Sequence, residues 1–81
     1  MNPNNDRLRK AFSTGLSIPI ERIIDDLAYN SISEWDSVAH MVLVSTIEEE
    51  FGIMLDTNEI LDLSSVGKAK QILQGHDLSF S

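Results

Sequence analysis

The segment from Ser37 to Phe51 constrains the fold more than any other part of the sequence. It predicts a helix, because Asp36 is a good N-cap residue and Gly52 is a good residue to end a helix. Trp35 precedes the cap and can pack as a hydrophobic staple. At about 100° per residue, one side of the helix becomes an apolar stripe that we expect to face the core: His40, Leu43, Val44, Ile47 and Phe51.

The opposite side of this helix is also apolar in its first half, where Val38, Met41 and Val42 lie. A chain of 81 residues has too little core to enclose both sides of one helix. Two interpretations stay open. Either the patch is a contact surface bordered by Glu48 and Glu49, or the long connection from residue 16 to 35 covers it.

Weaker helical patterns flank this segment. An amphipathic pattern covers Asn4–Gly15, and a single turn follows Asp56, with Thr57 as the predicted N-cap. Ser64 and Ser65 cap a last helix that ends at Gly75. We therefore predict an all-α fold for residues 1–81, a small four-helix bundle with a short third helix.

The connection from residue 16 to 35 has no clear period, and its Ile and Leu residues are expected to pack on the core. It forms a long loop between the first and second helices. No strand alternation is present. A chain of 81 residues has no room for a second domain, so a single domain is expected, with residues 76–81 as a frayed tail.

Charge excludes one class of partner. The chain has 13 Asp and Glu against 6 Lys and Arg, a net charge of −7, which argues against nucleic acid. The stretch from Ile23 to Gly67 contains no Lys or Arg. Such acidity fits a solvated face, a cation site or a basic partner. Its acidic residues are Asp25, Asp26, Glu34, Asp36, Glu48, Glu49, Glu50, Asp56, Glu59 and Asp62.

Catalytic and metal chemistry find little support. The absence of cysteine excludes disulfides, thiolate zinc sites and a cysteine nucleophile. Ser37, His40, His76 and Asp36 are the residue types of a hydrolytic triad, but no glycine-rich segment offers an oxyanion hole. The run after Asp56 lacks the glycine of a calcium loop. We predict no enzyme activity and no metal site.

Ser37 remains the most informative hydroxyl. It lies in the first turn of the predicted helix, where backbone N–H groups and the helix dipole favour a phosphate group. The residues alone leave two interpretations open, an ordinary capped turn and a site of phosphodiester modification.

No membrane association is expected. Met1–Lys10 is polar and lacks the apolar core of a secretory signal, and no window has the roughly 20 apolar residues of a membrane span. The sequence predicts a cytoplasmic, monomeric protein.

The run Asp36-Ser37-Val38, followed by Leu43, Ile47 and Glu48-Glu49-Glu50-Phe51-Gly52-Ile53, resembles the Asp-Ser-Leu motif and second helix of acyl carrier proteins. The likeness continues through the loop and the short third helix to Ser64-Ser65-Val66-Gly67-Lys68-Ala69. It covers nearly the whole chain and indicates a free-standing member of this phosphopantetheine-binding family.

The resemblance implies a carrier. A phosphopantetheinyl transferase would attach 4′-phosphopantetheine to Ser37 in the site that includes Asp36, and the arm would carry acyl, aminoacyl or hydroxyacyl groups as thioesters. Acyl-loading and acyl-transfer enzymes with basic patches would be the partners. They would meet these residues: Val38, Met41, Val42, Glu48 and Glu49.

Two departures concern specificity. Fatty-acid-synthesis carriers usually have acidic residues where this chain has Ala39 and Val42. The run from Trp35 to His40 is more similar to carriers of specialised pathways, such as polyketide biosynthesis, than to the housekeeping protein of fatty acid biosynthesis. The alternative is a degenerate, unmodified carrier that acts as a protein-protein interaction module.

Overall fold

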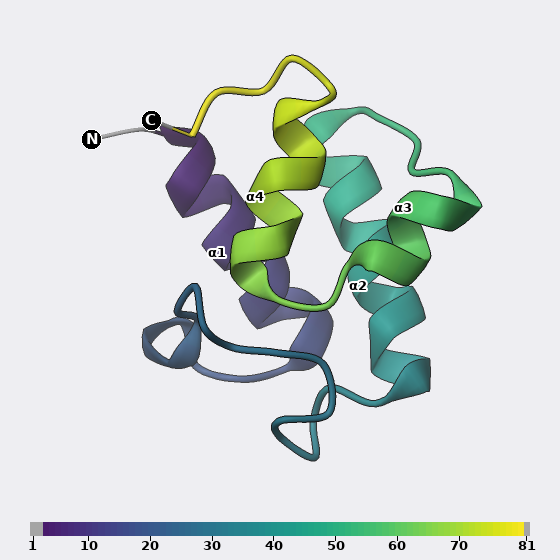
Figure 1. The fold of residues 1–81 in the computed structure, drawn as a ribbon. Coiled ribbons are helices and arrows are strands. Elements are labelled where there is room, and N and C mark those ends of the chain that lie inside the picture. Colours follow the sequence, from purple (N-terminus) through teal and green to yellow (C-terminus); the bar gives the residue numbers. More distant parts are fainter. Residues whose placement is uncertain (1–2, 81) are drawn as a thin grey trace.

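The computed structural model describes residues 3–80 and confirms an all-α bundle (Figure 1). No β-strand forms in that range. The elements are α1 (Pro3–Leu16), a 3₁₀ turn η1 (Ile20–Arg22), α2 (Ser37–Phe51), α3 (Thr57–Asp62) and α4 (Val66–Gln74). The short third helix and the long loop between α1 and α2 are both as predicted.

The ends of α2 follow from local chemistry. The Asp36 carboxylate accepts a hydrogen bond from the Ala39 N–H at 2.9 Å, as an N-cap does. Gly52 has φ 64°, a left-handed conformation that glycine adopts without steric cost, and so ends the helix. Both predicted ends of this helix are therefore confirmed.

Of the N-caps predicted from the sequence for α3 and α4, one is confirmed and the other is wrong. Ser65 caps α4 as predicted, because its Oγ accepts from the Lys68 N–H at 3.0 Å. The N-cap of α3 is Asp56, so the prediction of Thr57 was wrong. Asp56 and Glu59 bond to each other's backbone N–H in a reciprocal capping box, which places Thr57 inside the helix.

The core lies mainly between α1, α2 and α4. Helices α1 and α2 pack closely because Gly15 lies against Leu43, where a Cβ on residue 15 would be 2.9 Å from the Leu43 Cα. Gly15 is thus inside α1, which ends at Leu16. Among the largest fully buried side chains are Leu8, Phe12, Ile23, Trp35, Leu43, Ile47, Val66 and Leu73.

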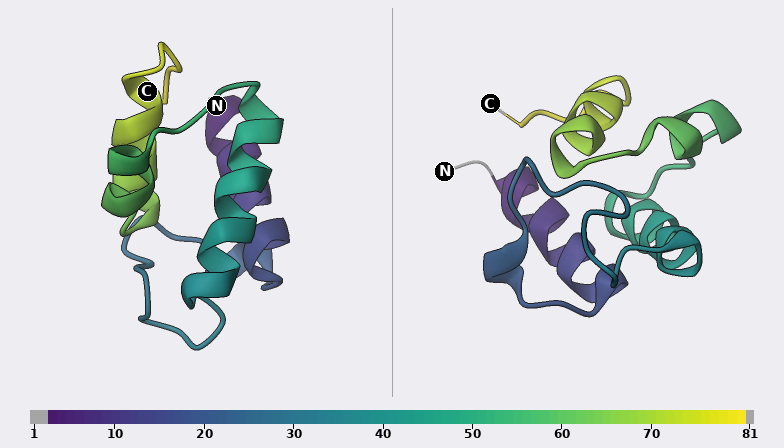
Figure 2. Two further views of the ribbon diagram at one scale, coloured as in Figure 1. Left: turned by 90° about the vertical axis from the view of Figure 1, so that its right-hand side faces the viewer. Right: turned by 60° about the horizontal axis from the view of Figure 1, so that its bottom comes forward.

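The loop between α1 and α2 runs across one end of the bundle (Figure 2). It buries Ile18, Ile23 and Leu27, in agreement with the expectation that its aliphatic side chains pack on the core. An antiparallel bridge joins Ala28 to Ser65, just before α4. The loop is therefore anchored to the chain between α3 and α4.

Residues 76–80 differ from the expected frayed tail, and Ser81 lies outside the described residues. Phe80 is only 9% exposed, and its ring lies 6.2 Å from that of Phe51. Its carbonyl accepts a hydrogen bond from the Asn5 side chain. Burial of this aromatic side chain stabilises the end of the chain against α1 and α2.

Among residues 3–80, no helix has the length and apolar character needed to cross a membrane.

Candidate functional site

Ser37 is the first residue of α2 and is exposed. The preceding residue fixes its position, because Asp36 caps the helix and the Asp36 carbonyl accepts from the His40 N–H at 2.8 Å. Within residues 3–80, the Ser37 hydroxyl makes no hydrogen bond. It is therefore available for chemistry, next to N–H groups that a helix leaves without partners in its first turn.

A cavity of about 390 Å³ opens beside Ser37. Its walls are formed by side chains from α2, from α3, from the loop between α1 and α2, and from the loop between α3 and α4. Most of them are apolar or aromatic, and the hydroxyls of Tyr29 and Ser64 add polar points. The lining residues are Tyr29, Ser37, His40, Met41, Ile60, Leu61, Leu63 and Ser64.

His40 uses both ring nitrogens. Its Nδ1 accepts a hydrogen bond from the Trp35 indole N–H at 3.0 Å, and its Nε2 lies 2.9 Å from the Ile60 carbonyl oxygen. Indole is only a donor and a carbonyl only an acceptor, so Nε2 carries the proton and Nδ1 carries none. A neutral imidazole bonded in this way cannot accept the proton of Ser37.

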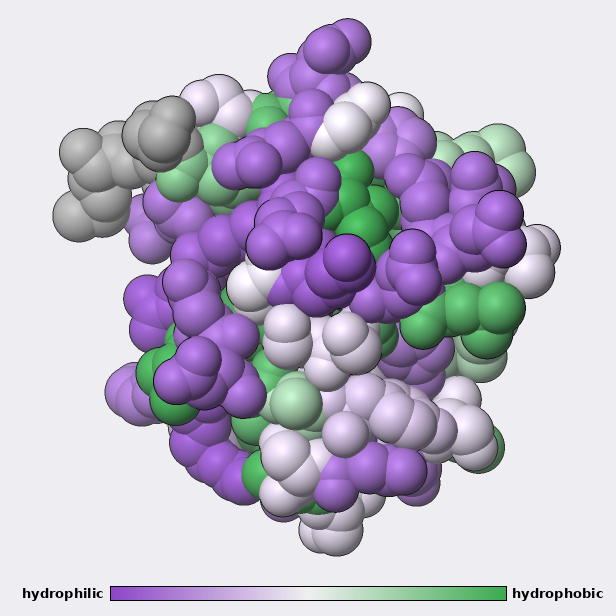
Figure 3. Space-filling view, viewed as in Figure 1, coloured by the Kyte–Doolittle hydropathy of each residue, from purple (hydrophilic) through white to green (hydrophobic). Residues whose placement is uncertain are grey.

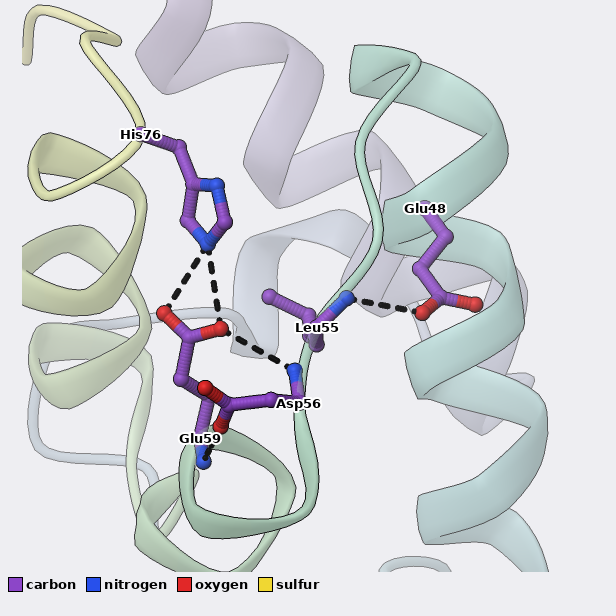
Figure 4. Close-up of polar contacts among 5 residues, drawn as sticks. All are labelled: Glu48, Leu55, Asp56, Glu59 and His76. Atoms are coloured by element: carbon purple, nitrogen blue, oxygen red, sulfur yellow. Dashed lines mark hydrogen bonds and ion pairs between the residues drawn. The ribbon is translucent and has the colours of Figure 1, made fainter.

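The other residues of the possible triad are also bound elsewhere. His76 Nε2 lies 2.9 Å from Glu59, and Asp36 caps α2 (Figure 4 shows the His76 pair). The structure does not assemble these residues around Ser37. In the described part of the chain, no three His, Asp or Glu side chains form a group that could hold a metal ion.

The apolar patch on α2 is not covered by another segment. Val38 is 73% exposed, and Met41 and Val42 are about half exposed. Leu61 of α3 and Met54 in the loop before it are exposed as well. Figure 3 shows hydrophobic surface at the right of the molecule, below α3. Sequence reasoning missed Leu61, because a six-residue helix is too short to show which side faces outward.

The two acidic residues expected at the border of this patch have different surroundings. Glu49 is exposed, whereas Glu48 is half-buried and its carboxylate accepts from the Leu55 N–H at 2.9 Å (Figure 4). One oxygen of Glu48 therefore holds the connection between α2 and α3. Nothing in the sequence distinguishes Glu48 from its neighbours, because the contact depends on the path of the loop.

Basic side chains from both ends of the chain form ion pairs with the stretch from Ile23 to Gly67, which has no Lys or Arg of its own. Among residues 3–80, three of its acidic residues pair with Lys or Arg: Glu50 with Arg7, Glu34 with Arg22 and Asp25 with Lys70. A fourth, Glu59, lies 2.9 Å from the His76 ring. The pKa of Glu34 is lowered, first by a hydrogen bond from its own backbone N–H and then by Arg22. The remaining negative charge includes the exposed Glu49.

A family model described as "Phosphopantetheine attachment site" matches residues 6–73, from α1 to the last turns of α4. The residues present fit such a group: Ser37 offers an unbonded hydroxyl, the start of α2 offers N–H groups for a phosphate, and the cavity offers apolar walls for an arm. Domains of this family carry 4′-phosphopantetheine covalently. The chain belongs to the phosphopantetheine attachment site family, consistent with an acyl carrier protein.

Proposed function

We propose that this protein is an acyl carrier whose Ser37 hydroxyl receives 4′-phosphopantetheine from coenzyme A. The serine oxygen loses its proton and forms the new bond to phosphorus, the pyrophosphate bond of coenzyme A breaks, and adenosine 3′,5′-bisphosphate leaves. The supporting observation is the exposed, unbonded hydroxyl of Ser37 at the first position of α2, beside a cavity with mainly apolar walls. The bound arm supplies a terminal thiol that holds acyl, aminoacyl or hydroxyacyl groups as thioesters. The chain has no cysteine of its own to compete with that thiol.

Asp36 acts by positioning Ser37. Its carboxylate holds the first turn of α2 through the Ala39 N–H, and the start of a helix favours the negative charge of a phosphate on Ser37. Because Asp36 is bound to the backbone, its role is to orient the serine. The catalytic groups for attachment come from the transferase.

The exposed side of α2 supports docking of partner enzymes. Val38, Met41 and Val42 supply apolar contact area, and Glu49 supplies negative charge for a basic patch. Glu48 has one oxygen left for a partner, since the other accepts from the backbone of Leu55. Opposite charges on the two surfaces speed association and allow rapid release, which suits a carrier that visits several enzymes.

Partner choice is proposed to differ from that of fatty-acid-synthesis carriers. Of the two departures from their pattern, Val42 is half exposed while Ala39 packs partly against the core. An apolar side chain thus occupies a surface position where those carriers usually have an acid. This supports a role in a specialised pathway, with the transferase and acyl-loading enzymes as partners.

The proposal includes a cytoplasmic, monomeric and non-catalytic protein. His40 is bonded to Trp35 and to Ile60, and His76 is bonded to Glu59. Neither histidine is therefore placed as a general base for Ser37. A cytoplasmic carrier would meet coenzyme A and the enzymes that use it.

A degenerate carrier is the second candidate. The exposed apolar side chains on α2, together with Leu61 and Met54, favour it, because they could bind a protein without any modification of Ser37.

Intact mass after incubation with coenzyme A, magnesium and a broad-specificity phosphopantetheinyl transferase separates the two. We expect the mass of one phosphopantetheinyl group on the wild type and on Ser45→Ala, which removes another exposed serine of α2. Ser37→Ala should gain none. An unmodified wild type, with a partner complex that forms equally well for Ser37→Ala, would instead establish the degenerate carrier.

A further inference from the structure

The first turn of α2, which carries Ser37, lies at the surface. Asp36, Ser37 and Val38 are all exposed, so burial does not hold this turn in place. The N–H groups of a first turn have no partners within the helix, and helix ends fray. The Asp36 carboxylate supplies one contact, through the Ala39 N–H. The direction in which Ser37 is presented therefore depends on the residues on either side of this turn.

Trp35 and His40 make a second contact across the same turn. They are five residues apart, and the Trp35 indole N–H donates to the His40 Nδ1 at 3.0 Å. The two ring planes differ by 18° and the centroids are 6.1 Å apart, so the rings meet edge to edge and the N–H points at the lone pair of Nδ1. These are the two positions that pack together in a hydrophobic staple. Here a hydrogen bond joins them.

Trp35 is held firmly on its own side of this contact. Its side chain is fully buried, and the Phe12 ring of α1 packs on it edge to face with centroids 5.4 Å apart. Its backbone N–H donates to the Ile32 carbonyl, and its carbonyl accepts from the Asn30 N–H. The indole cannot follow a displaced imidazole, so loss of the bond would release the start of α2 and leave the tryptophan in place.

We propose that the hydrogen bond between Trp35 and His40 is a clasp that positions Ser37 for phosphopantetheinyl transfer, with His40 as a positioning residue. The His40 backbone N–H donates to the Asp36 carbonyl at 2.8 Å, so the residue that bears the imidazole also closes the first backbone hydrogen bond of α2. Without the clasp, the Asp36 cap alone holds the turn, and Ser37 spends less time in the geometry that the transferase needs. This inference rests on the proposed modification of Ser37.

Three substitutions of His40 separate its two ring contacts. His40→Leu keeps a similar volume and removes both of them. His40→Asn places an amide oxygen where Nδ1 lies, so it can accept from Trp35 but is too short to reach Ile60. His40→Gln places an amide nitrogen near the position of Nε2, so it can donate to the Ile60 carbonyl but has no acceptor at the position of Nδ1.

The rate of transfer from coenzyme A by a broad-specificity transferase is the first readout. In His40→Leu and His40→Gln, kcat should fall at least roughly fivefold, as expected for one lost hydrogen bond, and His40→Asn should recover most of the rate. KM for the carrier should stay within about twofold, because Met41, Val42 and Glu49 lie beyond the first turn and still offer the docking surface. Trp35→Phe removes the donor, and combining it with His40→Leu should lower kcat no further than His40→Leu alone.

Hydrogen exchange and a control variant distinguish positioning from general stability. In unmodified protein, exchange of the backbone N–H of residue 40 should accelerate roughly fivefold in His40→Leu and His40→Gln but not in His40→Asn. Ala69→Gly in α4 lowers stability through helix propensity and should leave kcat unchanged. If His40→Leu does not fold, His40→Gln provides the same test.

Two results would overturn the inference: a wild-type kcat in folded His40→Leu or His40→Gln, or a loss in His40→Asn as large as in those variants. An equal loss in Ala69→Gly would also overturn it, because the effect would then follow stability alone. A wild type that takes no phosphopantetheinyl group would contradict the proposed function instead, and exchange at residue 40 would still test the clasp.

Discussion

The contact between α1 and α2 and the contact between α2 and α3 are built in different ways. Helices α1 and α2 meet through buried apolar side chains, with Gly15 against Leu43. Helix α3 buries no residue fully and is held by the contacts of His40 with the Ile60 carbonyl and of His76 with the Glu59 carboxylate. The Glu48 carboxylate accepts from the Leu55 N–H in the loop that precedes the helix. Close packing resists displacement, whereas a helix held by polar contacts at the surface opens at lower free energy.

The proposed attachment site lies where these two kinds of contact meet. Ser37 starts α2, whose one side is fixed in the core, while the cavity beside the serine has α3 as a wall. A carrier needs a fixed point of attachment and a wall that can respond to cargo and partners. The difference between the two contacts supplies both.

The largest predicted effect compares two leucines. Leu43→Ala should reduce the free energy of unfolding by about 2–5 kcal/mol, because it leaves a cavity where α1 and α2 meet. Leu61→Ala on α3 should change it by less than about 0.5 kcal/mol, since Leu61 is 75% exposed. Urea denaturation measures both, and similar losses for the two variants would remove the distinction between the two contacts.

Close approach of α1 to α2 gives the next effect. Gly15→Ala should cost about 1–3 kcal/mol, because the new Cβ would lie against the Leu43 backbone. Gly67→Ala in α4 is the control: its Cβ would meet the Asp25 carbonyl at 3.4 Å, and alanine favours helix, so stability should be unchanged or slightly higher. Thermal unfolding followed by circular dichroism compares them. A harmless Gly15→Ala would mean that the helices can separate at no cost.

A smaller and more local effect is expected where α2 connects to α3. Glu48→Ala removes the acceptor of the Leu55 N–H, a loss of about 1 kcal/mol, so exchange of that amide should accelerate roughly fivefold. Glu49→Ala changes an exposed neighbour, whereas the Leu55 N–H donates to Glu48, so this variant should leave exchange there unchanged. Hydrogen exchange by NMR resolves the two, and equal acceleration in both variants would contradict a specific role for Glu48.

The smallest effect concerns Glu34 in the loop that precedes α2. Its lowered pKa means that the folded state binds a proton less readily than the unfolded state, so this stabilisation is complete above the unfolded value near 4.5 and is lost as pH falls through the folded value. An NMR titration of the side chain should show the lowered pKa, and Arg22→Gln should raise it partly, because the backbone hydrogen bond remains. No change in Arg22→Gln would exclude a contribution from the arginine.

The sequence predicts the parts of this molecule that depend on neighbouring residues. Asp36, Gly52 and Ser65 act where local capping rules place them. The exposed patch was one of two open interpretations, since periodicity shows a second apolar side but not whether a loop covers it. The choice of Asp56 over Thr57 depended on a reciprocal bond with Glu59, which single-residue preferences do not distinguish.

Long-range contacts account for what the sequence did not reveal. The bonds of His40 to Trp35 and Ile60 need the loop and α3 to converge on α2, and helical periodicity alone placed the imidazole in the core stripe. The burial of Phe80 against Phe51 joins the end of the chain to the end of α2 in the same way. Such contacts become visible only when the path of the connecting segments is known.

The position of the modification tests the central claim most directly. Wild-type protein treated with coenzyme A and a broad-specificity transferase is digested, and the phosphopantetheinyl group is located by tandem mass spectrometry. We predict that it is attached to Ser37 alone. Attachment at Ser33 or Ser45, which are also exposed and close in sequence, or the absence of attachment, would contradict the account.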